Sequence, residues 1–212
     1  MLKPARAEEV SIAGPAGRLE CMLEKPAAGH PQGCAIVCHP HPLHGGTMHN
    51  KVVHTLARAF IAQGLATLRF NFRGVSASEG SHDNGVGEVD DVLAAVDWMA
   101  GRYPGLPVWL GGFSFGGAMA IRAATCRDVA GLISVAPAAY RFAGDLAAQP
   151  SCPWLIVHGE ADELVPVAET IEWVNSMEPG PELEVFAGTS HFFHGKLVEL
   201  RNSVSDFVGR HS

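Results

Sequence analysis

The chain has 212 residues, of which 47% are hydrophobic and 17% charged, and its formal net charge is −7. This composition excludes disorder as the main state. Because a typical domain has about 100–200 residues, the length predicts one domain over residues 1–212. The acidic balance and the absence of a Lys/Arg run argue against nucleic acid or an anionic membrane surface as a partner.

Neither a membrane span nor a targeting signal is predicted. No apolar run approaches the roughly 20 residues that cross a membrane, and the N-terminal residues lack the apolar core of a signal peptide. The cysteines are scattered, odd in number and form no Cys-x-x-Cys pair, which indicates reduced thiols. We therefore expect a cytoplasmic protein without a membrane partner.

Short apolar runs alternate with helix-period segments along the chain. The first two runs, at 10–13 and 19–24, are joined by a Gly-Pro-Ala-Gly turn and predict an antiparallel hairpin at a sheet edge. Six later runs have the length of buried strands: 34–38, 66–72, 107–110, 131–135, 154–157 and 183–186. Helical periodicity is found after Ser114 and at 50–63, 88–101, 167–177 and 196–208. This alternation predicts an α/β fold with a mostly parallel sheet covered by helices on both faces.

Residues 107–120, PVWLGGFSFGGAMA, run from a predicted strand through Gly-x-Ser-x-Gly into a helix of small residues. In this context the pattern is typical of a sharp strand-to-helix turn that lifts the hydroxyl of Ser114 above the sheet. The glycines are needed because the turn is tight and the strand and helix pass close together. The amide of Phe115 then lies beside the serine at a helix N-terminus, where developing negative charge is stabilised. Ser114 is the candidate nucleophile.

A serine nucleophile needs a base, and the base needs an orienting acid, each beyond a later strand. The run at 154–157 is followed by Glu160, Asp162 and Glu163, among which Asp162 is favoured because the following Leu-Val-Pro would pack back and fix its side chain. The run at 183–186 is followed first by His191 and then by His194. We expect His191 to be the base and His194 to pack at the start of the next helix.

The loop 38–50, CHPHPLHGGTMHN, follows a predicted strand at the position that supplies a second oxyanion donor. Because Pro40 and Pro42 have no N–H, the donor is expected to be the amide of His41 or Leu43. The clustered histidines also raise a zinc site as an alternative. The loop contains no carboxylate and its one thiol ends a buried strand, so no metal ligand is expected here.

Three motifs together resemble the α/β-hydrolase superfamily, and most of all its small bacterial, dienelactone-hydrolase-like members. They are HPHPxxGGxMxN at 39–50, RFNFRGVxxSxG at 69–80 and GGFSFGG at 111–117, and the resemblance covers about residues 8–208. It implies an eight-stranded sheet, a triad of Ser114, Asp162 and His191, and no cofactor. Ser76 departs from the usual glycine, which bears on loop shape. Only the short stretch 137–153 stands where larger relatives insert a cap, so we expect an open, shallow site.

The expected activity is hydrolysis of carboxylic esters or thioesters with small to medium acyl groups, through an acyl-enzyme. Acyl transfer to another acceptor uses the same residues, and the sequence does not separate the two. A hydrolase-fold binding protein without catalysis is the alternative from another class, and the intact triad counts against it. The partner is expected to be a small-molecule substrate, and its acyl and leaving groups are not readable from the sequence.

Overall fold

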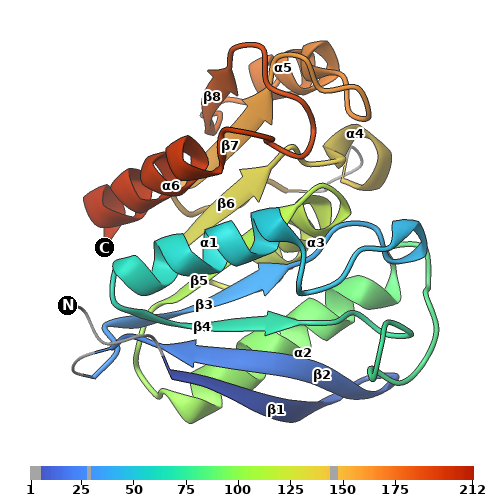
Figure 1. Ribbon diagram of the computed structural model, residues 1–212, viewed down its shortest axis with the longest axis vertical. Coiled ribbons are helices and arrows are strands. Elements are labelled where there is room, and N and C mark those ends of the chain that lie inside the picture. Colours follow the sequence, from blue (N-terminus) through green and yellow to red (C-terminus); the bar gives the residue numbers. More distant parts are fainter. Residues whose placement is uncertain (1–5, 28–29, 144–147) are drawn as a thin grey trace.

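The computed structural model describes residues 6–27, 30–143 and 148–212. In this part of the chain eight strands form one sheet in the order β1-β2-β4-β3-β5-β6-β7-β8 (Figure 1). The strands β1 and β2 form an antiparallel hairpin, β2 is antiparallel to β4, and β3 to β8 run parallel. Their bounds are β1 Arg6–Gly14, β2 Gly17–Lys25, β3 Gly33–Cys38, β4 Leu65–Phe70, β5 Val108–Phe113, β6 Gly131–Val135, β7 Trp154–Gly159 and β8 Glu182–Phe186.

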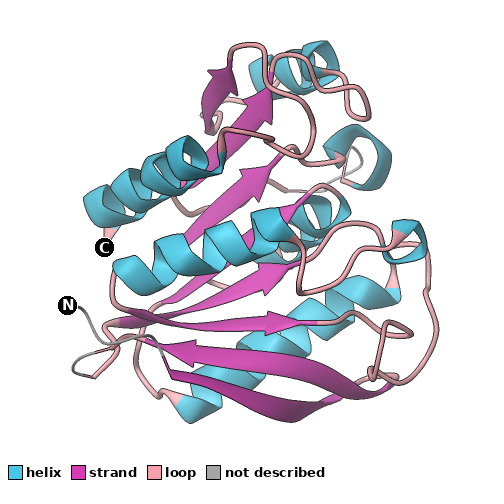
Figure 2. Cartoon of the chain, viewed as in Figure 1, coloured by secondary structure: helices cyan, strands magenta, loops and turns pink. Residues whose placement is uncertain are grey.

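Helices cover both faces of the sheet, which confirms the predicted fold class (Figure 2). On one face lie α1 (Lys51–Ala62) and α6 (Leu197–His211), which also pack against each other. On the other face lie α2 (Gly87–Arg102), α3 (Phe115–Ala124) and α5 (Val167–Asn175). A single helical turn, η1 (Pro42–His44), follows β3, and the short helix α4 (Ala139–Phe142) follows β6.

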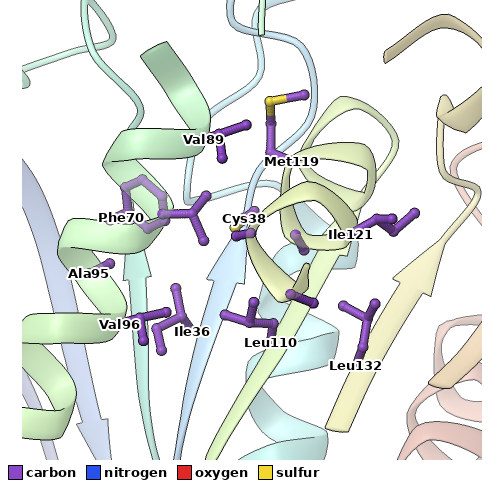
Figure 3. Packing of buried hydrophobic residues seen from close by; sticks show 14 of the residues in the cluster. Ile36, Cys38, Phe70, Val89, Ala95, Val96, Leu110, Met119, Ile121 and Leu132 are labelled. Carbon is purple, nitrogen blue, oxygen red and sulfur yellow. The ribbon is translucent and has the colours of Figure 1, made fainter. Parts of the chain in front are cut away.

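Two apolar clusters fill the space between the sheet and its helices. Because successive strand side chains point to opposite faces, Leu110 packs with α2 and α3 while its neighbour Trp109 packs with α1 and α6. Figure 3 shows the α2/α3 side, where Ile36, Leu110 and Leu132 from three neighbouring strands meet the helices. The central strands β3 to β7 are buried along their whole length, as strands covered on both faces must be.

Local chemistry explains where α1 begins and ends. The side chain of Asn50 caps the helix by accepting the amide of Val52 at 2.8 Å. Gly64, just beyond the last turn, has a φ of 80°, which favours glycine and ends the helix. The predicted helix at 50–63 is therefore confirmed to within a residue at each end.

The strand predicted at 183–186 is present, but the prediction that it is buried was wrong. These residues lie in β8, which pairs with β7 alone and stands at the edge of the sheet, and Val185 is 40% exposed. The side chains of Glu182 and Glu184 reach toward solvent and bind α6, at Arg210 and Ser203 respectively. An edge strand lacks a neighbour on one side, so its apolar residues are only half covered.

The five cysteines are all free thiols, as the sequence indicates, and Cys126 alone is exposed. None of the helices in the described residues combines the length and the hydropathy that a membrane crossing requires. Since β3 to β8 are parallel, their carboxyl ends meet at one edge of the sheet, and the loops that follow them converge there.

Candidate active site

Ser114 occupies a strained turn between β5 and α3. Its φ of 55° and ψ of −118° lie outside the regions that a serine normally adopts. At both flanking positions a side chain larger than that of glycine would collide with backbone atoms. A Cβ at Gly112 would lie 2.2 Å from the carbonyl oxygen of Gly116, and one at Gly116 would lie 2.4 Å from that of His39. The Gly-x-Ser-x-Gly pattern therefore builds the turn and brings the loop after β3 against it.

The loop after β7 directs one of its three carboxylates at an imidazole. Asp162 Oδ2 lies 2.7 Å from Nδ1 of His191, and Asp162 Oδ1 accepts the amides of Leu164 and Val165 at 2.9 and 2.8 Å. Those two amides belong to the Leu-Val-Pro segment that favoured Asp162 in the sequence. The other two carboxylates brace the loops instead. Glu160 accepts the amide of Gly188, and Glu163 that of His191.

Asp162 is held as a carboxylate. Burial alone would raise its pKa, but hydrogen bonds from His158, from His191 and from the backbone of Val165 outweigh it and place the pKa well below its ordinary value. The charge opposite Nδ1 fixes the tautomer of His191, with the proton on Nδ1 and the free electron pair on Nε2. This is the form in which an imidazole accepts a proton from a hydroxyl.

His158 is a site residue to which the sequence analysis assigned no role. It lies near the end of β7, wholly buried, with Nε2 at 2.9 Å from the carbonyl oxygen of Val165 and 3.3 Å from Asp162 Oδ2. Both neighbours are acceptors, so Nε2 carries the proton and donates to them. In the sequence, the available signal was that His158 directly follows the apolar run 154–157 and lies four residues before Asp162.

His191 and Ser114 line the same cavity. The imidazole is 2% exposed and packs against Phe113 and Phe192, with ring centroids 4.9 and 5.2 Å away. Contacts between nucleophile and base are commonly long in unliganded sites and shorten when substrate binds. The exposed side chain of His194 contacts Phe192 and does not line this cavity.

The histidines of the loop after β3 have different roles. His39 is buried, with Nδ1 at 2.6 Å from the carbonyl oxygen of Pro40, and its Nε2 accepts the amide of Phe72 at 3.0 Å. Burial lowers its pKa to about 4, so His39 is neutral. Its hydrogen bond with Phe72 connects the loops after β3 and β4. His41 and His44 line the cavity. No cluster of metal-ligating side chains is formed within the described residues.

The amide of Leu43 donates to Nδ1 of His41 at 3.2 Å, and Leu43 is 72% exposed and does not line the cavity. The amides of His41 and Phe115 have no acceptor within the described part of the chain. Both residues line the cavity, and their rings pack with centroids 5.0 Å apart. Of the two loop candidates, the amide of His41 is therefore the one without an acceptor among the described residues.

The cavity above Ser114 has a volume of about 600 Å³, within the range of sites for small molecules. Its walls include the short helix α4, with Tyr140, Arg141 and Phe142, and one side of α5, with Thr170 and Trp173. The sequence analysis expected an open, shallow site and did not assign α5 to its walls. They form because the loops after β6 and β7 bring α4 and α5 together.

Known proteins resemble this chain in sequence and in fold. The model of the family described as serine aminopeptidase, S33, matches residues 34–143. An α/β serine hydrolase homologue from Coxiella burnetii is 48% identical and has a TM-score of 0.90, with 94% of this chain and 96% of that one covered. The chain belongs to the α/β-hydrolase superfamily. The crystal structure of XC6422 from Xanthomonas campestris, described as a serine hydrolase without lid, also resembles this α/β hydrolase. It is 40% identical, with a TM-score of 0.92 over 99% of this chain and 97% of that one.

Two curated proteins are also similar in sequence. The uncharacterized protein RP471 of Rickettsia prowazekii is 32% identical over 210 residues, which cover 94% of this chain and 88% of that protein. Human monoglyceride lipase is 37% identical over 125 residues, which cover 56% of this chain and 39% of the lipase. The resemblance inferred from the sequence motifs is confirmed at the level of the α/β serine hydrolases.

Proposed function

We propose that this α/β hydrolase cleaves carboxylic esters or thioesters of small to medium acyl groups through a triad of Ser114, His191 and Asp162. The observation that carries the proposal is the 2.7 Å hydrogen bond between Asp162 and His191, whose ring lines the same cavity as Ser114. The strained elbow and the lowered pKa of Asp162 support it, because each favours a group that acts in catalysis over one that only stabilises the fold.

The reaction follows from the positions of these groups. Nε2 of His191 takes the proton of the Ser114 hydroxyl as its oxygen attacks the carbonyl carbon, and the resulting imidazolium is stabilised by Asp162. The imidazolium then protonates the leaving alcohol or thiol, and an acyl-enzyme remains. Water gives a proton to Nε2 as it attacks the acyl carbon, and the imidazolium returns that proton to the oxygen of Ser114 as the acid is released.

The oxyanion of each tetrahedral intermediate is assigned to two backbone amides, those of Phe115 and His41. The amide of Leu43, the other sequence candidate, is less suited because it already donates to His41 and lies outside the cavity lining. The similarity of the chain to monoglyceride lipase over 125 residues agrees with ester hydrolysis. The cavity volume of about 600 Å³ fits a small or medium acyl group.

The test combines covalent labelling with turnover. A fluorophosphonate probe should label the wild type and not Ser114→Ala, and the kcat for p-nitrophenyl butyrate should fall by several orders of magnitude in that variant. Ser203→Ala, on α6 and outside the cavity, is the matched control and should behave as the wild type. Release of free butyrate in buffer separates hydrolysis from acyl transfer. Unchanged labelling in Ser114→Ala, or more than about a tenth of wild-type activity, would overturn the nucleophile assignment.

A further inference from the structure

A second cavity lies behind α4 and adjoins the candidate active site. Its volume is about 420 Å³, and its lining includes Asn84 and Arg122. The two cavities share four lining residues: Tyr140, Arg141, Phe142 and Trp173. The short helix α4 and Trp173 of α5 therefore border both cavities.

The charges around the two cavities are distributed unevenly. The second cavity has two arginines and no carboxylate among its described lining residues, in a chain whose formal net charge is −7. Glu169 on α5 is the carboxylate found among the described residues that line the first cavity. The guanidinium of Arg141, which lines both cavities, is a cation that attracts anions to this side of the site.

Arg141 is the cation that a ligand can reach from both cavities. Its side chain is exposed, and no carboxylate of the described residues pairs with it. Other arginines are ion-paired, namely Arg18, Arg69, Arg73, Arg127 and Arg210. Arg122 donates to the carbonyl of Phe142 at 3.1 Å and holds α4 against α3, so we assign it a structural role.

Arg141 and His41 line the same cavity. The pKa of His41 is lowered, first by burial and then by the neighbouring His44, His82 and Arg141. The guanidinium is therefore close enough to the loop after β3 for its charge to act on that ring. A group bound by Arg141 would lie in the cavity that His41 and Ser114 also line.

We propose that Arg141 is a specificity residue that binds an anionic group of the substrate, a carboxylate or a phosphate some atoms away from the scissile carbonyl. This inference rests on the proposed hydrolysis at Ser114 and names the substrate class: esters or thioesters that carry a negative charge. The planar guanidinium binds carboxylate and phosphate alike through paired N–H donors. Such a contact is made in both the bound substrate and the transition state, so it acts mainly on KM.

The test compares matched substrates. In the wild type, kcat/KM for the p-nitrophenyl monoester of adipic acid should exceed that for p-nitrophenyl hexanoate about tenfold. In Arg141→Gln this ratio should fall to about one through a higher KM for the adipate ester, and Arg141→Lys should keep part of it. Arg201→Gln, an exposed arginine on α6 that lines neither cavity, should keep the full ratio. Butyryl-coenzyme A and S-butyryl-N-acetylcysteamine form a second pair. Both are thioesters of butyrate, and only coenzyme A carries phosphates in the leaving group.

Two kinetic results would overturn the inference. One is a wild type that prefers the neutral member of both pairs, and the other is an Arg141→Gln variant that keeps the preference for the anionic member. A binding measurement separates this failure from failure of the proposed hydrolysis. Ser114→Ala should bind adipic acid monoanilide about tenfold more tightly than hexananilide by calorimetry, and the added Arg141→Gln should abolish the difference. Equal binding of the two anilides refutes the role of Arg141 whatever the turnover shows.

Discussion

Gly116→Ala adds one methyl group at the closest contact between α3 and the loop after β3. The new Cβ would lie 2.4 Å from the carbonyl oxygen of His39 and 2.5 Å from that of Cys38, and both are backbone atoms. Relief requires the helix and the loop to move apart by roughly 1 Å. Such overpacking costs about 1–3 kcal/mol, and the better helix propensity of alanine offsets at most about 1 kcal/mol. We expect a net destabilisation of about 2 kcal/mol.

The same displacement separates the two proposed oxyanion donors, because Phe115 belongs to α3 and His41 to the loop. A misplacement of about 1 Å at a reacting centre costs about 10²-fold in rate. The kcat for p-nitrophenyl butyrate should therefore fall by about that factor while the protein stays folded. Urea denaturation gives the stability. With a slope of about 2–3 kcal/mol/M, the midpoint should fall by nearly 1 M.

Gly101→Ala on α2 is the matched control, since a Cβ there would meet nothing within 4 Å. It should stabilise the protein by about 0.5–1 kcal/mol through helix propensity and leave kcat unchanged. If Gly116→Ala matched the wild type in both urea midpoint and kcat, the close contact between elbow and loop would not control the geometry of the site.

Two further predictions concern buried polar groups. Asp162→Asn keeps the shape but presents an amide to His158 and His191, so kcat should fall by about 10⁴-fold, whereas Glu163→Gln should lose less than tenfold. A kcat within tenfold of wild type for Asp162→Asn would contradict the triad. His39 has a folded-state pKa lowered from 6.5 to about 4, so unfolding takes up a proton between these values. The free energy of unfolding from urea titrations should fall by about 3 kcal/mol as pH drops through this window, and less steeply in His39→Gln. Equal slopes would show that His39 is not buried as a neutral group.

The features that could be predicted are those encoded by neighbouring residues. Asn50 and Gly64 bound α1 because one caps it and the other ends it locally. Gly112 and Gly116 predicted the elbow because the contacts they permit lie within one turn of Ser114 and at the adjoining strand. The choice of Asp162 over its two acidic neighbours also depended on local chain direction.

The features that could not be predicted depend on tertiary packing. Residues 183–186 look like a core strand, and only the strand order shows that they form an edge. His39 and His41 are alike in sequence, yet one is buried against the amide of Phe72 and the other faces the cavity. The walls from α4 and α5 join residues some 30 positions apart, and no periodicity reports that contact.

The left-handed backbone at Ser114 sets the stability of the protein against its proposed chemistry. A non-glycine residue in such a conformation costs about 1–3 kcal/mol, and glycine would occupy it without strain. Selection of variants for resistance to heat alone therefore favours glycine at this position and removes the hydroxyl. Serine is retained only where turnover is also selected. The residue at position 114 therefore distinguishes variants selected for turnover from variants selected for heat resistance alone.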